Sequence, residues 1–175
     1  MKKPFTLHSG PITLRHLRLS DADSMATYAN DRGIARNTAA LPSPYRKSHA
    51  TSWLKVLQRE YRQKKADRLH LGIEIDGHIV GVIGIDLDGQ RGTLGYWLGR
   101  PYWGQGIMTR VVRLLTAYAF RRYRLVRIDA HVFSFNIGSA RVLEKAGFKR
   151  EALLIKHFNK RGRLIDELIY VKFRR

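Results

Sequence analysis

One uninterrupted stretch of the sequence contains a strand pattern, a glycine loop, a helical pattern and a second strand pattern. Thr93–Leu98 is typical of a strand, and Gly104 and Gly106 follow it two residues apart. Apolar residues then recur at helical spacing, at Ile107, Val111, Leu114, Leu115 and Tyr118. Val126–Phe133 has the pattern of another strand. A strand, a helix and a strand joined by one crossover predict two parallel strands in one sheet.

The segment before this unit predicts an antiparallel meander. Leu69–Ile75 alternates in the manner of a strand, and Asp76-Gly77 is a strong signal for a two-residue hairpin turn. His78–Leu87 is the predicted return strand. A turn over Asp88–Gly92 then leads into the strand described above.

Nearer the N-terminus, the sequence predicts one short strand and two helices. Ile12–Arg15 alternates as a strand does. Ser20 is a suitable N-cap, with an acidic residue three positions later, for a helix that ends near Asn30. Two prolines mark the loop that follows. Ser48–Gln63 has the apolar spacing of a second helix.

The C-terminal part predicts a short helix and a final pair of strands. Ile137–Ala146 is the predicted helix, with Asn136 as its N-cap. Phe148–Phe173 is predicted to form two strands around a turn at Asn159–Gly162. The whole pattern predicts an α/β protein of the mixed (α+β) type, with one domain over residues 1–175. Its central sheet is mostly antiparallel, with one parallel pair, and helices pack on it.

Charge is the unusual quantity in the composition. The chain has 33 Lys and Arg against 14 Asp and Glu, a formal net charge of +19 at pH 7. Such a field attracts polyanions such as a ribosome or a nucleic acid, but a basic surface that only keeps the protein soluble has the same charge. The segment between Asp88 and Asp129 has eight arginines and no acidic residue, so an anionic ligand is expected there first. The residues expected to be exposed far from the glycine loop include Lys160, Arg161, Arg163, Arg174 and Arg175.

The composition also excludes several kinds of site. The chain has no cysteine, which excludes disulfides, thiol nucleophiles and thiolate metal sites. Its seven histidines show no metal-ligand spacing, so no metal is expected. The segment Met1–Phe5 lacks the apolar run of a signal peptide, and no stretch is long enough to span a bilayer. We therefore expect a cytoplasmic protein with no membrane association.

The loop before Ile107 has the features of a diphosphate site. Gly104 and Gly106 let the backbone approach an anion closely. The helix that follows adds unpaired N–H donors and a partial positive charge at its N-terminus. The loop lacks the Gly-Lys-Ser/Thr of a Walker loop and is not a complete Gly-x-Gly-x-x-Gly fingerprint. Taken alone, two glycines at this spacing are equally compatible with a tight structural turn.

The stretch from Gly95 to Thr109 resembles the acetyl-CoA loop of the GNAT N-acetyltransferases, whose pattern is Gln/Arg-x-x-Gly-x-Gly/Ala. The glycines match its two small positions, whereas Pro101 stands at its first position. Within the family, the branch that acetylates ribosomal-protein N-termini is the one most similar to this segment, whose sequence is Gly-Tyr-Trp-Leu-Gly-Arg-Pro-Tyr-Trp-Gly-Gln-Gly. The segment Asn136–Phe148 agrees, with its Asn-x-x-Ser and Glu-Lys-x-Gly-Phe blocks. The resemblance covers nearly the whole chain in the expected order.

The resemblance implies an acyl-CoA N-acyltransferase fold and an enzyme that transfers acetyl from acetyl-CoA to a primary amine. It implies a sheet that is splayed between the strand ending at Leu98 and the strand near Val132, with the pantetheine arm in that gap. The diphosphate would bind backbone N–H groups from about Trp103 to Thr109. The implied coenzyme-binding residues are Trp97, Leu98, Trp103, Gly104, Gln105, Gly106, Ile107, Met108, Thr109, Asn136 and Ser139.

Acetyl transfer needs a neutral amine, a stabilised oxyanion and a proton for the leaving thiolate. The resemblance makes Ser139 the candidate proton donor and Asn136 the residue that holds the coenzyme arm. Both are equally compatible with a structural role at a helix N-terminus. Many relatives have a carboxylate at the position of Thr93, so the general base stays open. The candidates for it are Asp86, Asp88, Glu74 and Tyr96.

The missing carboxylate favours an acceptor that needs little help to lose its proton. An α-amine has a pKa of about 7.7–8.0 and a lysine of about 10.4, so a protein N-terminal α-amine of the ribosomal type is the favoured acceptor. A small amine such as an aminoglycoside, a polyamine or an amino-acid analogue is the alternative. A ribosome or another polyanion is a possible partner. The alternative of another class is a non-catalytic CoA- or RNA-binding module, although no RNA-recognition signature occurs.

Overall fold

The computed structural model describes residues 5–63 and 67–174, and within these ranges eight strands form one sheet in the order β1-β2-β3-β4-β5-β6-β8-β7. The strands are β1 (Thr6–Ser9), β2 (Ile12–Arg15), β3 (Arg68–Ile75), β4 (His78–Asp88), β5 (Arg91–Leu98), β6 (Arg127–Phe133), β7 (Lys149–Lys160) and β8 (Arg163–Phe173). The helices are α1 (Ala22–Ala29), α2 (Arg32–Asn37), α3 (Lys47–Gln63), α4 (Ile107–Arg122) and α5 (Ile137–Lys145), with 3-10 turns η1 (Leu19–Asp21) and η2 (Arg100–Tyr102). No helix in these ranges is long and apolar enough to cross a bilayer. Residues 1–4, which hold most of the segment assessed for a signal peptide, lie outside the described residues.

The predicted mixed sheet is confirmed. The pair β5 and β6 is parallel, because α4 connects the end of one strand to the start of the other, and the other described pairs are antiparallel. Asp76 and Gly77 join β3 to β4 with φ angles of 49° and 77°. Arg161 and Gly162 join β7 to β8 in the same way, with φ of 53° and 82°. Two consecutive left-handed residues form the turn that matches the twist of paired strands, so both predicted hairpins are present. The second turn is shorter than predicted, because Asn159 and Lys160 still belong to β7.

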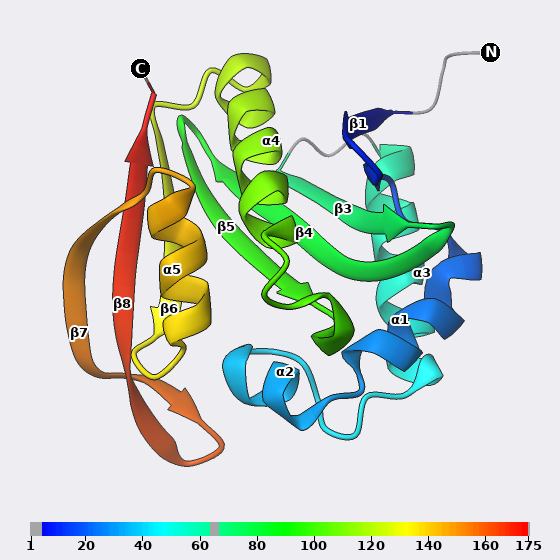
Figure 1. Ribbon diagram of the computed structural model, residues 1–175, viewed down its shortest axis with the longest axis horizontal. Coiled ribbons are helices and arrows are strands. Elements are labelled where there is room, and N and C mark those ends of the chain that lie inside the picture. The colour runs from blue at the N-terminus through cyan, green and yellow to red at the C-terminus, as the bar shows by residue number, and fades with distance from the viewer. Residues whose placement is uncertain (1–4, 64–66, 175) are drawn as a thin grey trace.

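The parallel pair separates after a short stretch. Arg91–Thr93 of β5 are in register with Arg127–Asp129 of β6. Beyond these residues, β5 continues to Leu98 and β6 to Phe133, and the two strands diverge (Figure 1). The sheet is therefore splayed between these strands, as the resemblance implied.

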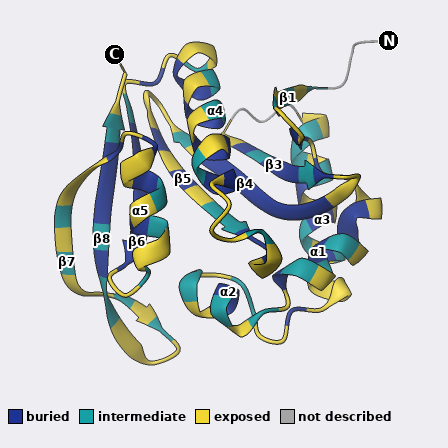
Figure 2. Cartoon of the chain, in the orientation of Figure 1, coloured by how far each residue is buried: buried dark blue, intermediate teal, exposed yellow. Residues whose placement is uncertain are grey.

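Helices cover both faces of the sheet, with α4 and α5 on one face and α1 and α3 on the other (Figure 1). Val111 and Leu115 of α4 belong to the same core cluster as Ile83 of β4. Leu54 of α3 belongs to a second core cluster, which contains Val82 of β4. Successive strand residues point to opposite faces, so β4 contributes to both cores and is buried along most of its length (Figure 2).

The start of α1 differs from the prediction. Ser20 is not the N-cap, because η1 precedes the helix and Asp21 occupies the N-cap position, without a hydrogen bond from its side chain to α1. The Asp21 carboxylate accepts hydrogen bonds from the Arg18 N–H (2.7 Å) and from both terminal nitrogens of Arg15 (2.9 Å each). Arg15 is buried and also donates to Glu74 (2.5 Å). A charge removed from water needs such partners, so a long-range ion cluster, rather than a local capping preference, positions this end of α1.

Two short elements, β1 and α2, were not predicted. A helix of six residues is too short to be stable on its own, so both ends of α2 depend on side chains. Asp31 accepts hydrogen bonds from the Gly33 N–H (2.7 Å) and the Ile34 N–H (3.0 Å) at the first end. Lys160, from the end of β7, donates to the Ala35 carbonyl (2.8 Å) and to two further carbonyls at the other end.

This contact corrects the expectation for Lys160. Its ammonium is bound to backbone and the residue is half-buried, so it is not part of the free basic surface. Arg161 and Arg163, next to Lys160 at the hairpin turn, and Arg174, at the other end of β8, are exposed as expected. Arg175 lies outside the described residues.

Candidate active site

A cavity of about 1560 Å³ follows the splay of the sheet. It is lined by Leu94–Leu98 of β5 and by Ala130–Phe133 of β6. These are the parts of the two strands that lie beyond their last paired residues. Gly104, Ile107 and Met108 line it from the face of the sheet that α4 covers, and Trp53 of α3 lines it from the other face; residues 37–42 also belong to its wall. The cavity therefore runs through the sheet and joins its two faces.

The glycine loop has the backbone that an anion site needs. Gly104 and Gly106 have φ angles of +75° and +71°, in the region that only glycine adopts without strain. A Cβ atom added at either position would meet nothing within 4 Å, so the conformation, not crowding, requires glycine. Gly106 is also the N-cap of α4 and has no side chain with which to cap it. The N–H groups of the first turn, Ile107–Thr109, are left for a bound anion, which the helix N-terminus favours.

Two other predicted coenzyme residues brace this loop. Trp103 Nε1 donates a hydrogen bond to the Leu98 carbonyl (2.6 Å), and Gln105 Nε2 donates to the Pro101 carbonyl (2.8 Å). The Leu98 carbonyl is thereby already engaged, and the Gln105 side chain holds the loop. Trp97 packs on the opposite face of the sheet, with the core below α1 and α3. The predicted coenzyme-binding residues therefore have different roles. Some line the cavity, Trp103 and Gln105 support the loop, and Trp97 packs against the second core.

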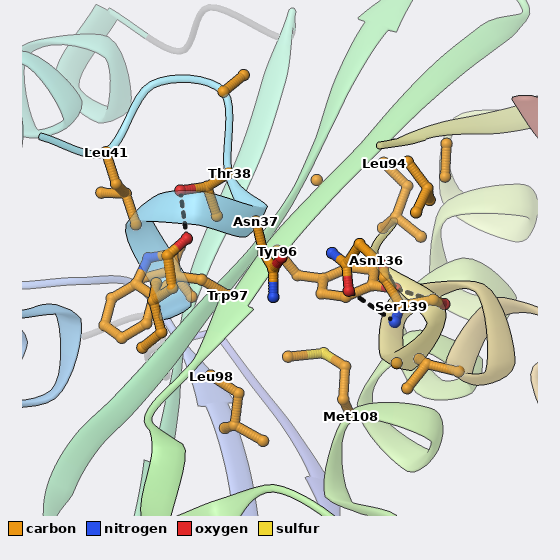
Figure 3. A pocket seen from close by; sticks show the side chains of 18 of the residues that line it. Asn37, Thr38, Leu41, Leu94, Tyr96, Trp97, Leu98, Met108, Asn136 and Ser139 are labelled. Atoms are coloured by element: carbon orange, nitrogen blue, oxygen red, sulfur yellow. Dashed lines mark hydrogen bonds between the residues drawn. The ribbon is translucent and has the colours of Figure 1, made fainter. Parts of the chain in front are cut away.

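Ser139 lies in the first turn of α5 and meets Tyr96 from β5. Ser139 Oγ and Tyr96 Oη are 2.7 Å apart, and Asn136 Oδ1 accepts a hydrogen bond from the Ser139 N–H (3.2 Å) (Figure 3). All three residues line the cavity. Although part of the Tyr96 ring is exposed there, desolvation raises the pKa of its hydroxyl above the ordinary value. The phenol stays protonated and can donate to Ser139 Oγ, which leaves the serine proton for a group in the cavity.

The four residues that the sequence offered as general base differ in whether they line the cavity and in what they contact. Glu74 is paired with Arg15 across the β2–β3 edge, and Asp88 ends β4 at the turn before β5. Neither residue lines the cavity. Tyr96 contacts Ser139 on the α5 side, as described above. Asp86 does line the cavity, but a hydrogen bond from His70 lowers the pKa of its carboxyl, and a carboxylate that holds a proton less tightly is a weaker base.

A cluster that the sequence analysis missed lies on the β6 wall. His131 lines the cavity beside Glu167 of β8, and Asp129 lies two residues before it on the same strand. Thr93, where the resemblance implied a carboxylate, donates from Oγ1 to Asp129 Oδ2 (3.4 Å). The signal in the sequence is the Asp-x-His spacing in a strand, which puts both side chains on one face. Glu167 is 36 residues further along and has no such signal.

A mixed sheet that is splayed at its parallel pair, with a glycine loop and a helix N-terminus at one end of the gap, defines an acyl-CoA N-acyltransferase. The acetyltransferase (GNAT) domain model matches residues 12–149. The chain therefore belongs to the GNAT acetyltransferase family and is an N-acetyltransferase with acetyl-CoA as co-substrate. This excludes the non-catalytic module.

Named relatives agree with this assignment. The N-acetyltransferase p20 of Bacillus licheniformis is 30% identical over 173 residues, which cover 97% of each chain. The structure of Mycobacterium smegmatis RimJ in complex with CoA-disulfide is 26% identical, with a TM-score of 0.85, over 98% of this chain and 88% of that chain. The fold is also that of the microcin C7 self-immunity acetyltransferase MccE in complex with acetyl-CoA and AMP. That match has a TM-score of 0.85 and 23% identity, over 95% of this chain and 94% of that chain.

Proposed function

We propose that this N-acetyltransferase acetylates the α-amine at the N-terminus of a protein, in the cavity between β5 and β6. The observation that carries the proposal is that a single cavity is lined by the glycine loop and α4 from one face of the sheet and by α3 from the other. An amine can thus approach from the side opposite the coenzyme. The volume of about 1560 Å³ exceeds the roughly 300–1,000 Å³ of a small-ligand pocket, which leaves room for a chain end beside the coenzyme.

On this proposal, the coenzyme is held mainly by backbone. The N–H groups of Gly104, Gly106 and the first turn of α4 bind its diphosphate, and Trp103 and Gln105 keep the loop in shape. When bound, acetyl-CoA supplies the activated acetyl group. Ser139, supported by Tyr96, donates a proton to the departing sulfur. Asn136 caps α5 and so keeps Ser139 in place.

The acceptor class is supported by the residue at position 93. Thr93 cannot remove a proton as a carboxylate would, which favours an α-amine of pKa about 7.7–8.0 over a lysine of pKa about 10.4. The structure of RimJ is similar to this chain over nearly its whole length. The name RimJ belongs to the branch that the sequence resembles. Both points favour a protein N-terminus of the ribosomal type.

Release of free thiol from acetyl-CoA tests the acceptor. The panel contains a peptide with a free N-terminus, the same peptide with a blocked N-terminus and an internal lysine, a polyamine and an aminoglycoside. We expect kcat/KM for the free N-terminus to exceed the others by at least about tenfold, which corresponds to about 1.4 kcal/mol of transition-state binding. A small amine that is preferred by the same margin would contradict the proposal.

A small acceptor is the second candidate, and one observation favours it. The fold is shared with MccE, whose structure contains AMP beside acetyl-CoA, so the same architecture serves a protein that binds a nucleotide-sized molecule. The panel above distinguishes the two candidates, because a small acceptor gains nothing from the peptide chain beyond the amine.

A further inference from the structure

The alternation of β6 places three side chains on the acceptor side of the splay. Ile128, Ala130 and Val132 belong to the core cluster that includes α4 and α5. Successive strand residues point to opposite faces, so Asp129 and His131 point to the other face. They therefore lie across the sheet from the α4 and α5 core, on the side from which an acceptor amine enters. Glu167 of β8 faces the same way, because it is in register with Phe133, which is also on that face.

The His131 ring lies between two buried carboxylates. Its Nε2 is 3.8 Å from Asp129 Oδ2 and its Nδ1 is 3.7 Å from Glu167 Oε2. The two carboxylate side chains are 7% exposed, whereas the side chain of His131, which lines the cavity, is 41% exposed. Both distances exceed hydrogen-bond length. The carboxylates therefore attract a positive charge on the ring and still leave a ring nitrogen accessible to a substrate.

Each carboxylate is fixed by a further partner. Arg127 Nε donates to Asp129 Oδ1 (3.3 Å), and His157 Nδ1 lies 2.7 Å from Glu167 Oε2. These residues come from β6 and β7, so the geometry is held from both sides of β8. The described residues contain no group of three or more His, Asp or Glu side chains that could hold a metal ion. His131 is thus an exposed imidazole at the cavity wall, held between two buried carboxylates that belong to two different strands.

We propose that His131 is the general base that takes the proton from the acceptor amine, with Asp129 and Glu167 as positioning residues. The inference rests on the proposed acetyl transfer in this cavity. The amine nitrogen forms a bond to the acetyl carbon, the bond from that carbon to sulfur breaks, and one proton leaves the nitrogen for His131. The sulfur receives one proton from Ser139. A proton returns from His131 to Ser139 through solvent, so the overall reaction consumes none.

A rival histidine lies on the opposite wall. His70 of β3 lines the cavity near Asp86, with its Nε2 3.4 Å from Asp86 Oδ1. The His70 side chain is 19% exposed and packs against Trp53. Its ring also lies directly against Gly84, because a Cβ atom added to Gly84 would be only 1.8 Å from the ring. A ring wedged between β4 and α3 has less access to a substrate than His131, so the β6 histidine is favoured.

The test compares His131→Gln with wild-type enzyme on a free N-terminal peptide, by thiol release. We expect kcat to fall by about 10²–10⁴-fold near neutral pH, the range for one general base. The loss should shrink as the pH is raised to about 9, where an α-amine of pKa about 7.7–8.0 is already neutral. Stabilisation of the fold by acetyl-CoA should be unchanged. Imidazole added to His131→Ala should restore part of the rate.

Two matched substitutions complete the design. His78→Gln changes an exposed histidine in the β3–β4 hairpin, away from the cavity, and should have the wild-type rate. A wild-type rate in His131→Gln, or a pH-independent loss without imidazole rescue, would overturn the proposal. A loss in His70→Gln with a normal His131→Gln would assign the base to the other wall and overturn it as well. Wild-type enzyme that acetylates no amine would instead contradict the proposed function.

Discussion

At the scale of single residues, Ser139 shows how burial and capping prepare a proton donor. Its backbone N–H is bound by Asn136, which is a local effect of the helix N-terminus. Its hydroxyl is bound by Tyr96 from a strand 43 residues earlier in the chain. Burial raises the pKa of the Tyr96 hydroxyl, so this group keeps its proton and can donate it to Ser139 Oγ.

Ser139→Ala should lower kcat while leaving coenzyme binding nearly intact. The loss should be no more than about 10²–10⁴-fold, because one proton donor contributes about that much. The measurements are steady-state thiol release and the shift in melting temperature with acetyl-CoA. Ser134→Ala, at an exposed position just after β6, is the matched control. A normal kcat in Ser139→Ala would leave Ser139 with only its helix-terminal role.

At the scale of elements, the β7–β8 hairpin and α2 are connected across the mouth of the cavity. The Lys160 ammonium donates hydrogen bonds to the carbonyls of Ala35, Arg36 and Thr38 (2.8, 2.8 and 2.5 Å). These carbonyls lie at the C-terminal end of α2, where the helix leaves them unpaired and favours a cation. Residues 36–42 line the cavity, so one side chain from β7 positions that part of its wall.

Lys160→Met should destabilise the protein by about 1–3 kcal/mol, the range for removing hydrogen bonds to a charged group. Because the α2 wall would lose its anchor, KM for a peptide acceptor should rise more than KM for acetyl-CoA. Chemical denaturation and steady-state kinetics measure the two effects. Lys149→Met, at an exposed position at the other end of β7, should change neither. Equal changes in the two KM values would argue against a local effect on the acceptor wall.

At the scale of the whole molecule, the net charge of +19 is the feature that the active site does not explain. The cavity lining contains both signs, with Asp86 and Glu167 as well as Arg36, Arg100, Arg141 and Lys145. The basic exterior suits a polyanion. Acetyl-CoA needs only a few of the basic groups, so we propose that the rest help deliver the acceptor on a particle such as the ribosome.

Replacing Arg161, Arg163 and Arg174 together by Gln should flatten the salt dependence of ribosome binding. Each phosphate contact that is lost should reduce the slope of log K against log salt by about 0.7–0.9. Acetylation of a short peptide should be unchanged. The same number of charges removed from α3, at Lys55, Arg59 and Arg62, tests whether position matters. Ribosome binding that is absent at low salt, or equal effects of both triple variants, would argue against a specific basic face.

Short-range patterns determined most of the fold. The Asp76-Gly77 turn, the helical spacing after Gly106 and the cap at Asn136 depend on residues within a few positions of one another. Their geometry is the same in any context, which is why the meander, α4 and α5 were predicted. The crossover between β5 and β6 followed from connection length alone. The glycine loop was predicted for the same reason, since positive φ angles and a helix start are local properties.

The tertiary structure alone decided what long-range contacts control. Asp21, not Ser20, occupies the N-cap position of α1, because the buried Arg15 needs a paired charge. Lys160 is bound to α2 because the Ala35 carbonyl, 125 residues earlier in the chain, lies beside β7. His131 meets Glu167 only because β6 and β8 pair in one register. Sequence spacing does not predict such pairs, since strand register and packing determine which side chains come into contact.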